Sequence, residues 1–280
     1  MKHLIFLLLL SPCCFNLKAQ KTNSSLKKGQ FYFSWGYNRS TYANSDIHFE
    51  GPGYDFTLAN VVAKDFPTPI SEIKTYLNPS LLSIPQFNFH VGYFFKDNWA
   101  LSIGWDHMKY VMVNDQLSSI TGSISGQVSS PAITVNPNYA GTYQNQAFTI
   151  NSKDFLTFEH TDGFNYASVE IENYHTIWSS KKKNSKLDWV NGFGAGLVVP
   201  RSDVRLFTVG ANHFWNVAGA GASIKTGLRW QFSKKVYFEG IAKAGSTNLW
   251  KIQTTGRAVD KASQVISYLE GYGALGVYIK

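Results

Sequence analysis

Hydrophobic and polar residues alternate with a period of two along residues 86–110, QFNFHVGYFFKDNWALSIGWDHMKY. The alternation stops at the polar triplet Lys96-Asp97-Asn98 and then resumes. Alternation on both sides of a short polar turn predicts a β-hairpin. One face of this hairpin is rich in aromatic residues and the other is small or polar. The apolar residues that share a face on either side of the turn are Phe87, Phe89, Val91, Tyr93 and Phe95, then Trp99, Leu101, Ile103 and Trp105.

The same alternation recurs in six further segments, so the chain is predicted to be all-β with eight strands. The two long segments 41–83 and 113–163 are interpreted mainly as loops, because proline or Ser, Thr, Asn and Gly interrupt them. Ten or twelve strands remain open if these segments contribute hairpins, and Tyr54–Leu58 is a candidate. Besides the hairpin, the expected strands lie within 30–40, 165–178, 187–199, 215–232, 236–245 and 265–279.

Three features favour an eight-stranded antiparallel transmembrane β-barrel with long extracellular loops over a soluble sandwich. Connections alternate between long and short, as in barrels with short periplasmic turns. Glycines recur on the expected inner face, where small residues fit a narrow interior. Aromatic residues gather at the short turns, which predicts an interfacial girdle. These aromatic residues are Phe95, Trp99, Trp178, Trp189, Phe232, Phe238 and Tyr278.

The first residues predict export. A basic start, the apolar run Leu4–Leu10 and a polar exit are typical of a signal peptide, with cleavage expected after Ala19. The expected organisation is a signal peptide over 1–19 and an outer-membrane β-barrel over 20–280. A lipoprotein site at Cys13 is the alternative, although the preceding proline fits it poorly. Both cysteines precede the expected cut, which argues against a disulfide-stapled fold.

The charge is moderately basic. Removing Lys2 and Lys18 with the signal peptide leaves 24 basic residues against 18 acidic ones, a net charge of +6. The lysines cluster before the first strand and in short turns, at Lys181–Lys183 for example. We interpret them as periplasmic groups near anionic headgroups and expect no nucleic-acid partner. No segment approaches the roughly 18 consecutive apolar residues that a transmembrane helix needs.

Several segments resemble a small outer-membrane β-barrel protein of the Bacteroidota type, an uncharacterised porin-like family. The resemblance covers nearly the whole mature chain. It implies a barrel in the outer membrane of a Gram-negative cell, but no reaction. The final lysine departs from the terminal aromatic residue that is typical of such barrels. The segments that carry the resemblance are FYFSWGYNRS, SDIHFEGPGYDFTL, GYFFKDNWALSIGWDH, FEHTDGFNY and GYGALGVYIK.

A possible nucleophilic site lies on the polar face of the opening hairpin. If its turn centres on Asp97, His90 faces Gly104, with Ser102 and Asp106 as diagonal neighbours. A Ser, a His and an Asp together suggest catalysis. We favour a polar lumen whose groups satisfy one another, and the chain lacks the His-x-Ser triplet of lipid A deacylase barrels. No catalytic residue is therefore assigned.

A possible metal site involves histidines and carboxylates at the extracellular strand ends. His48, His107, His160 and Asp162 are the candidates, and all belong to segments that could converge. Carboxylate and imidazole groups suit divalent metals, but no HExxH or similar spacing occurs. We expect no metal and no cofactor.

A set of charged residues is predicted to point into the lumen. Such a set is usually a paired structural core, although it could also line a narrow pore. About the turn at Lys234, Arg229 is expected to oppose Glu239. The expected lumen charge network comprises Glu170, Glu172, Lys225, Arg229, Glu239, Lys243 and Glu270.

The sequence therefore predicts a non-enzymatic barrel with a structural or surface-interaction role through its long loops. An outer-leaflet lipid or lipopolysaccharide-modifying enzyme and a narrow passive pore are the alternatives. The expected partners are outer-membrane lipid, lipopolysaccharide and an unknown extracellular ligand, and the protein is expected to be a monomer.

Overall fold

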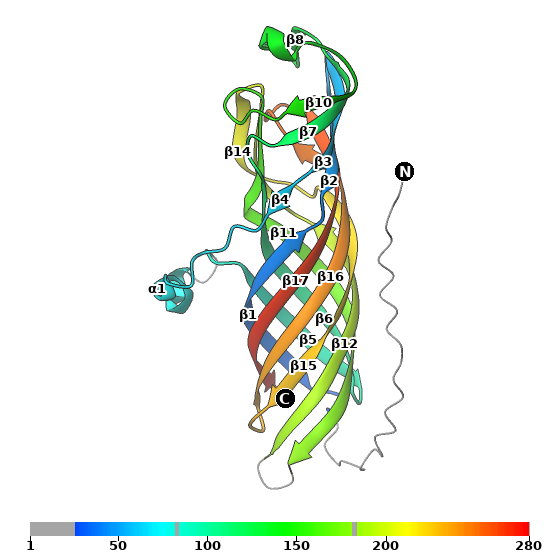
Figure 1. Cartoon of the computed structure of the whole chain (residues 1–280). Coiled ribbons are helices and arrows are strands. Elements are labelled where there is room, and N and C mark those ends of the chain that lie inside the picture. The colour runs from blue at the N-terminus through cyan, green and yellow to red at the C-terminus, as the bar shows by residue number, and fades with distance from the viewer. Residues whose placement is uncertain (1–25, 82–83, 181–183, 280) are drawn as a thin grey trace.

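Eight antiparallel strands close into a ring in the computed structural model, which describes residues 26–81, 84–180 and 184–279 (Figure 1). Strand β17 pairs with β1 and closes the ring. The predicted eight-stranded barrel is confirmed. The predicted signal peptide and Lys181–Lys183 lie outside the described residues. In ring order the strands are β1 (Phe31–Tyr42), β5 (Phe87–Lys96), β6 (Trp99–Met112), β11 (Leu156–Ser180), β12 (Ser185–Val198), β15 (Gly219–Gln231), β16 (Val236–Gln253) and β17 (Lys261–Ile279).

The opening hairpin has the register that its sequence predicts. His90 pairs with Gly104 and Phe87 with His107. Asn98 takes a left-handed conformation, with φ of 63°, in the turn. Asn tolerates this region better than most residues, which explains why so short a turn closes the hairpin.

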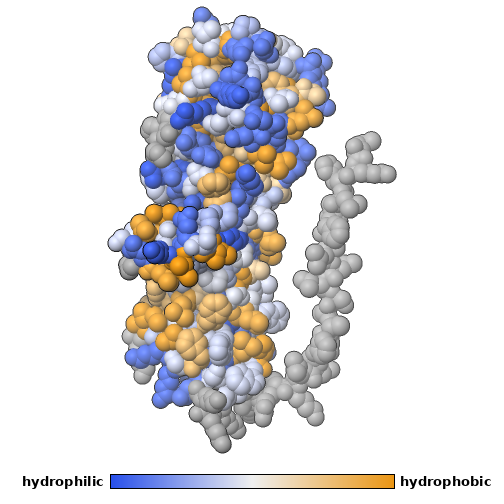
Figure 2. Space-filling view, turned by 60° about the vertical axis from the view of Figure 1, so that its left-hand side comes forward, coloured by the Kyte–Doolittle hydropathy of each residue, from blue (hydrophilic) through white to orange (hydrophobic). Residues whose placement is uncertain are grey.

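A belt of hydrophobic side chains surrounds the lower part of the barrel (Figure 2). Leu101 and Ile103 are 50% and 64% exposed, while Ser102 between them is buried. Outward apolar and inward polar residues are the pattern of a membrane-spanning strand. One member of the expected girdle was assigned wrongly. Tyr278 faces the lumen, where its ring lies 4.8 Å from that of Tyr237, because it shares the inward parity of β17.

Above the belt the long connections form further strands (Figure 1). We call these strands, together with the upper ends of β6, β11, β16 and β17, the head. Strands β2, β3, β7 and β10 extend the sheet from β17, and β13 and β14 extend it from β11. The head elements are β2 (Ser45–Gly51), β3 (Tyr54–Val61), β4 (Ala63–Lys64), β7 (Leu117–Ile124), β8 (Gln127–Val128), β9 (Ile133–Thr134), η2 (Pro137–Tyr139), β10 (Gly141–Thr149), β13 (Arg201–Leu206) and β14 (Val209–Trp215).

The expectation of loops was therefore wrong for much of 41–83 and 113–163, and strands also occupy much of 200–214 and 247–264, which lie largely outside the expected strands. These strands pair across long sequence separations, as in Lys261 with Glu50 and Tyr54 with Ile124. Local alternation does not reveal such partners. The expected strand at Tyr54–Leu58 is confirmed within β3. Two short helices, α1 (Ile73–Leu77) and η1 (Pro79–Leu81), project from the connection between β4 and β5.

The interior changes character along the barrel. Within the head it is an apolar core that includes Phe56, Leu58 and Phe158. Lower down, charged and hydroxyl groups fill the lumen. Among the residues that the structure describes, no helix is long and apolar enough to cross a membrane.

Candidate functional sites in the lumen and on the head

A layer of tyrosines surrounds Arg229 near the short-turn end of the lumen. The Arg229 guanidinium carbon lies 4.0 Å from the ring centre of Tyr237, 4.5 Å from that of Tyr174 and 4.7 Å from that of Tyr32. Its Nη2 lies 2.7 Å from Glu239 Oε2, a partner that pairs with Arg229 across the two strands. Aromatic faces and a carboxylate together compensate the buried charge.

Above this layer, two lysines hold the carboxylates of the lumen together. Lys225 Nζ lies 2.5 Å from Glu170 Oε2 and 2.6 Å from Glu172 Oε1. Lys243 Nζ lies 2.8 Å from Glu170 Oε1 and 2.6 Å from Asp106 Oδ2. Glu170 therefore bridges both lysines, so the groups form one network rather than separate pairs.

Asn88 joins Glu270 to this network. Its Nδ2 donates to Asp106 Oδ1 at 2.6 Å and to Glu270 Oε1 at 2.8 Å. Asp106, Lys243 and Glu270 have 0% of their surface exposed. Groups that line a water-filled channel would be accessible, so this layer is filled by side chains, as eight strands allow.

The candidate catalytic residues share the inner face of the β5–β6 hairpin but are engaged with other partners. Ser102 Oγ donates to Glu172 Oε1 at 3.1 Å. His90 Nε2 lies 3.4 Å from Glu170 Oε2, and Asp106 is held by Lys243. Within the described chain no hydrogen bond joins Ser102 to His90. A Ser–His pair acts as a nucleophile only with the two side chains in hydrogen-bond contact, whereas here the Ser102 hydroxyl donates to Glu172 instead.

The candidate metal ligands are engaged with different partners. His48 Nε2 contacts Asp55 Oδ1 at 2.9 Å on β2 and β3, and His107 Nδ1 contacts Asn165 Oδ1 at 2.7 Å. Asp162 lies 3.8 Å from Arg201 Nε. Over the described ranges, no group of three or more His, Cys, Asp or Glu side chains is arranged to hold a metal ion.

His160 has a different environment, inside the head core. Its Nδ1 lies 2.9 Å from Ser202 Oγ, and its ring contacts Tyr110, Phe158 and Phe164. Burial lowers the pKa of His160 to about 3, because charging the ring in this apolar setting is unfavourable. His160 is therefore a neutral core residue.

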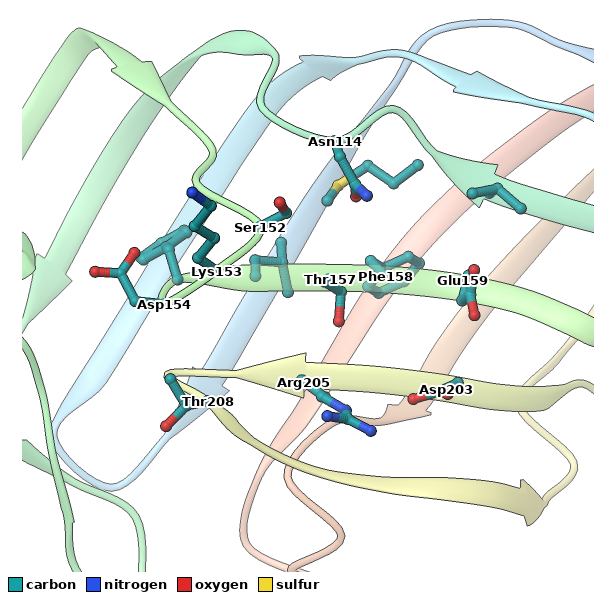
Figure 3. Close-up of a pocket in the computed structure, with 14 residues that line it drawn as sticks. Asn114, Ser152, Lys153, Asp154, Thr157, Phe158, Glu159, Asp203, Arg205 and Thr208 are labelled. Atoms are coloured by element: carbon teal, nitrogen blue, oxygen red, sulfur yellow. The ribbon is translucent and has the colours of Figure 1, made fainter.

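The outer surface of the head carries a groove of about 390 Å³ (Figure 3). Its floor comes from the upper part of β11, and β13 and residues 111–114 and 152–155 form its sides. The lining residues are Val111, Met112, Asn114, Ser152, Lys153, Asp154, Phe155, Leu156, Thr157, Phe158, Glu159, Asp203, Arg205 and Thr208.

Charges of both signs line this groove. Glu159 and Asp203 are direct cross-strand neighbours, an arrangement that repulsion makes unfavourable. Burial raises the pKa of Glu159, and the charge of Asp203 raises it further. Arg205 lies opposite Thr157, and Lys153 lies toward the other end of the groove from Glu159 (Figure 3).

Sequence reasoning missed Lys153, Asp203 and Arg205 as site residues. A signal was present in Arg201–Leu206, RSDVRL, where charged residues alternate with Ser202, Val204 and Leu206. This segment lies outside the strands that the alternation predicted. Its pairing with β11, which creates the groove, is a tertiary contact that the local sequence does not encode.

Comparisons with known proteins give structural likenesses only. No protein-family model matches the chain, and no curated protein matches it. The outer membrane protein OprG from Pseudomonas aeruginosa is 8% identical, with a TM-score of 0.43, over 90% of this chain and 97% of that one. Ail of Yersinia pestis is 11% identical, with a TM-score of 0.32, over 90% and 99%. The outer membrane protease OmpT from Escherichia coli is 7% identical, with a TM-score of 0.31, over 92% and 99%.

The chain is an integral outer-membrane β-barrel protein. The closed ring of eight antiparallel strands and its hydrophobic belt carry this conclusion. Closed barrels satisfy every backbone group within lipid, and an even number of strands with short turns at one end is typical of the outer membrane.

Proposed function

We propose that the protein is a non-enzymatic barrel of a Bacteroidota-type Gram-negative cell, porin-like in fold and exported by a signal peptide, whose head binds an extracellular ligand. The supporting observation is the contrast between a lumen filled by buried ion pairs and a head with its own apolar core and an open charged groove. A rigid extracellular scaffold with a concave site suits binding better than transport.

The groove favours a small ligand that carries both a positive and a negative group. Glu159 and Asp203 would accept the cationic end, and an ion there would relieve their mutual repulsion. Arg205 and Lys153 would hold the anionic end. Val111, a partly exposed residue of the lining, supplies apolar surface in the groove. Zwitterions such as dipeptides or phosphorylethanolamine have this chemistry.

Calorimetry with a panel of dipeptides and phosphorylethanolamine tests the proposal on the purified protein in lipid nanodiscs. For the panel members that bind, the double variant Glu159→Gln/Asp203→Asn and the single variant Arg205→Gln should each weaken binding about tenfold, equivalent to about 1.4 kcal/mol. Lys251→Gln, on the exposed face of β16, is the control. Binding that no groove variant alters would contradict the proposal, as would a panel that does not bind.

Lipid analysis separates this function from lipid or lipopolysaccharide modification. Cells that express the wild type, Ser102→Ala or His90→Ala should have the same lipid A and phospholipid species. A lipid product that appears with the wild type and disappears with Ser102→Ala would replace the binding function with an enzymatic one. The wild-type protein purified in detergent should sediment as a monomer, in keeping with a barrel that closes within one chain.

A further inference from the structure

A short segment beside the barrel exposes an unusual amount of apolar surface. Ile70, Ile73 and Leu77 are 80%, 61% and 74% exposed, and Phe66 is 56% exposed. These residues lie in and before α1, which projects from the barrel wall (Figure 1). Contiguous exposed apolar patches on a protein surface mark contact with a partner or a membrane.

The segment is fixed to the outside of β1. Tyr37 Oη donates to the Tyr76 backbone oxygen at 2.6 Å. Arg39 Nη2 donates to Tyr76 Oη at 2.7 Å and to the Thr68 backbone oxygen at 3.2 Å. Because side chains of the barrel wall hold the backbone of the segment, its apolar residues have a defined position relative to the belt.

That position is the upper edge of the hydrophobic belt. On β1 the outward residues run upward from Phe31 through Trp35 to Arg39, and Arg39 pairs with Gly271 on β17. The next outward residue of β17, Leu269, is still 56% exposed. Figure 2 shows the hydrophobic side chains of the projecting segment just above the belt.

A shallow apolar groove of about 320 Å³ lies between the segment and the wall. Tyr37, Ile70, Ile73 and Tyr76 contribute to its lining. Hydrocarbon chains suit such a surface.

We propose that this segment is a lipid-contacting arm, whose apolar side chains lie among the acyl chains of the outer leaflet. The arm continues the hydrophobic belt, which already faces lipid. The irregular backbone of the segment fits the interface rather than the hydrocarbon centre, because headgroup water can satisfy its polar groups there. Amphipathic elements at this depth bury only their apolar face, and Lys74 of α1 suits the anionic groups of the headgroup layer.

Spin labelling tests the depth of the arm. The full chain, with Cys13→Ser and Cys14→Ser, would receive a single nitroxide through Ile73→Cys or Ile70→Cys and be reconstituted in dioleoylphosphatidylcholine vesicles. Leu269→Cys is the lipid control from the belt. Leu117→Cys is the water control, since Leu117 is 72% exposed on the head. Folding of each variant is checked by its altered migration on a gel without boiling.

Collisions with oxygen and with a water-soluble nickel complex report the environment of each label. The proposal expects positions 70 and 73 to resemble position 269, with oxygen collisions at least about threefold more frequent, relative to nickel, than at position 117. Values equal to those at position 117 would overturn it, because the arm would then lie in water. Shielding from both reagents would also overturn it, because a protein surface, such as a second copy, would then cover the arm.

Discussion

The lumen within the membrane and the interior of the head are built on the same inward-facing positions but from opposite chemistry. On β6, Ser102 and Asp106 point inward at the level of the belt, whereas Met108 and Tyr110 point inward above it. The alternation continues without interruption, and only the hydropathy of the two faces is exchanged. Lipid outside the strand removes the need for an apolar interior, whereas water outside restores it.

The two interiors also differ in how they resist substitution. In the lumen, Lys225, Lys243 and Arg229 each lie against specific carboxylates, so the loss of one partner leaves a buried charge. In the head, apolar contacts are distributed over many neighbours, so one truncation removes only its own contribution and leaves a cavity. The following variants test this contrast.

Replacing Lys243 should have the largest effect. Lys243→Met leaves Asp106 and Glu170 without one of their cations in a site that has no exposed surface. Such a break of a buried pair costs about 3–5 kcal/mol. Urea unfolding of the refolded protein in vesicles measures it. Lys251→Met, on the exposed face of the same strand, is the matched control, and equal losses in both variants would contradict the network.

Truncating Leu58 should destabilise the head and leave the barrel intact. Leu58 is fully buried in the apolar core, and Leu→Ala in such a site costs about 3 kcal/mol. Limited proteolysis should cut the head of Leu58→Ala faster, while migration of the unboiled barrel on a gel stays unchanged. Leu117→Ala is the exposed control. If Leu58→Ala also lost the gel migration of the unboiled barrel, the two interiors would be one cooperative unit and the contrast would fail.

Acid should weaken the head through His160. Its folded pKa of about 3 lies below the ordinary value near 6.5, so the unfolded chain takes up the proton first. The stability that neutral His160 contributes is present above pH 6.5 and is lost as pH falls toward 3, by about 2 kcal/mol between pH 6.5 and pH 5. The raised pKa of Glu159 acts in the opposite direction.

The difference in head stability between the wild type and His160→Gln isolates the effect of the histidine, because Glu159 is present in both proteins. Head stability from proteolysis at a series of pH values should fall more steeply for the wild type between pH 6.5 and pH 5. Parallel curves would mean that His160 can be protonated in the folded head, and hence that its site is more hydrated than its burial indicates.

The smallest effect is expected for an exposed ion pair on the head. Lys261 Nζ lies 2.7 Å from Glu50 Oε1, with side chains 47% and 42% exposed. Exposed pairs contribute about 0.5 kcal/mol and are screened by salt. Lys261→Ala should therefore change head stability by about that amount in low salt and by less at 1 M salt. A loss as large as that of Lys243→Met would remove the distinction between buried and exposed charges.

The barrel was predictable because its information is local. A period-two pattern fixes which side chains face outward, and a short turn fixes the register of the hairpin, so that His90 was placed opposite Gly104 from sequence alone. Arg229 was likewise placed opposite Glu239. Burial on one side of a strand specifies register strongly, and this constraint acts along the whole barrel.

The head and the partners of the lumen residues were not predictable in the same way. Lys243 reaches Asp106 across the interior, over a sequence separation of 137 residues, and no turn relates their registers. Asp203 meets Glu159 only because β13 pairs with β11. The local pattern could show that Ser102, His90 and Asp106 share a face. It could not show that their polar atoms contact Glu172, Glu170 and Lys243, respectively.

Electrical recording tests the central claim, that side chains fill the lumen within the membrane. The purified protein would be inserted in planar bilayers, with insertion verified by the unboiled gel shift of the same sample. Because Lys243, Asp106 and Glu270 are inaccessible to water, we expect no stable conductance in 1 M KCl. Reproducible, ohmic single-channel steps would contradict it, since ions would then pass through a layer that the paired charges should close.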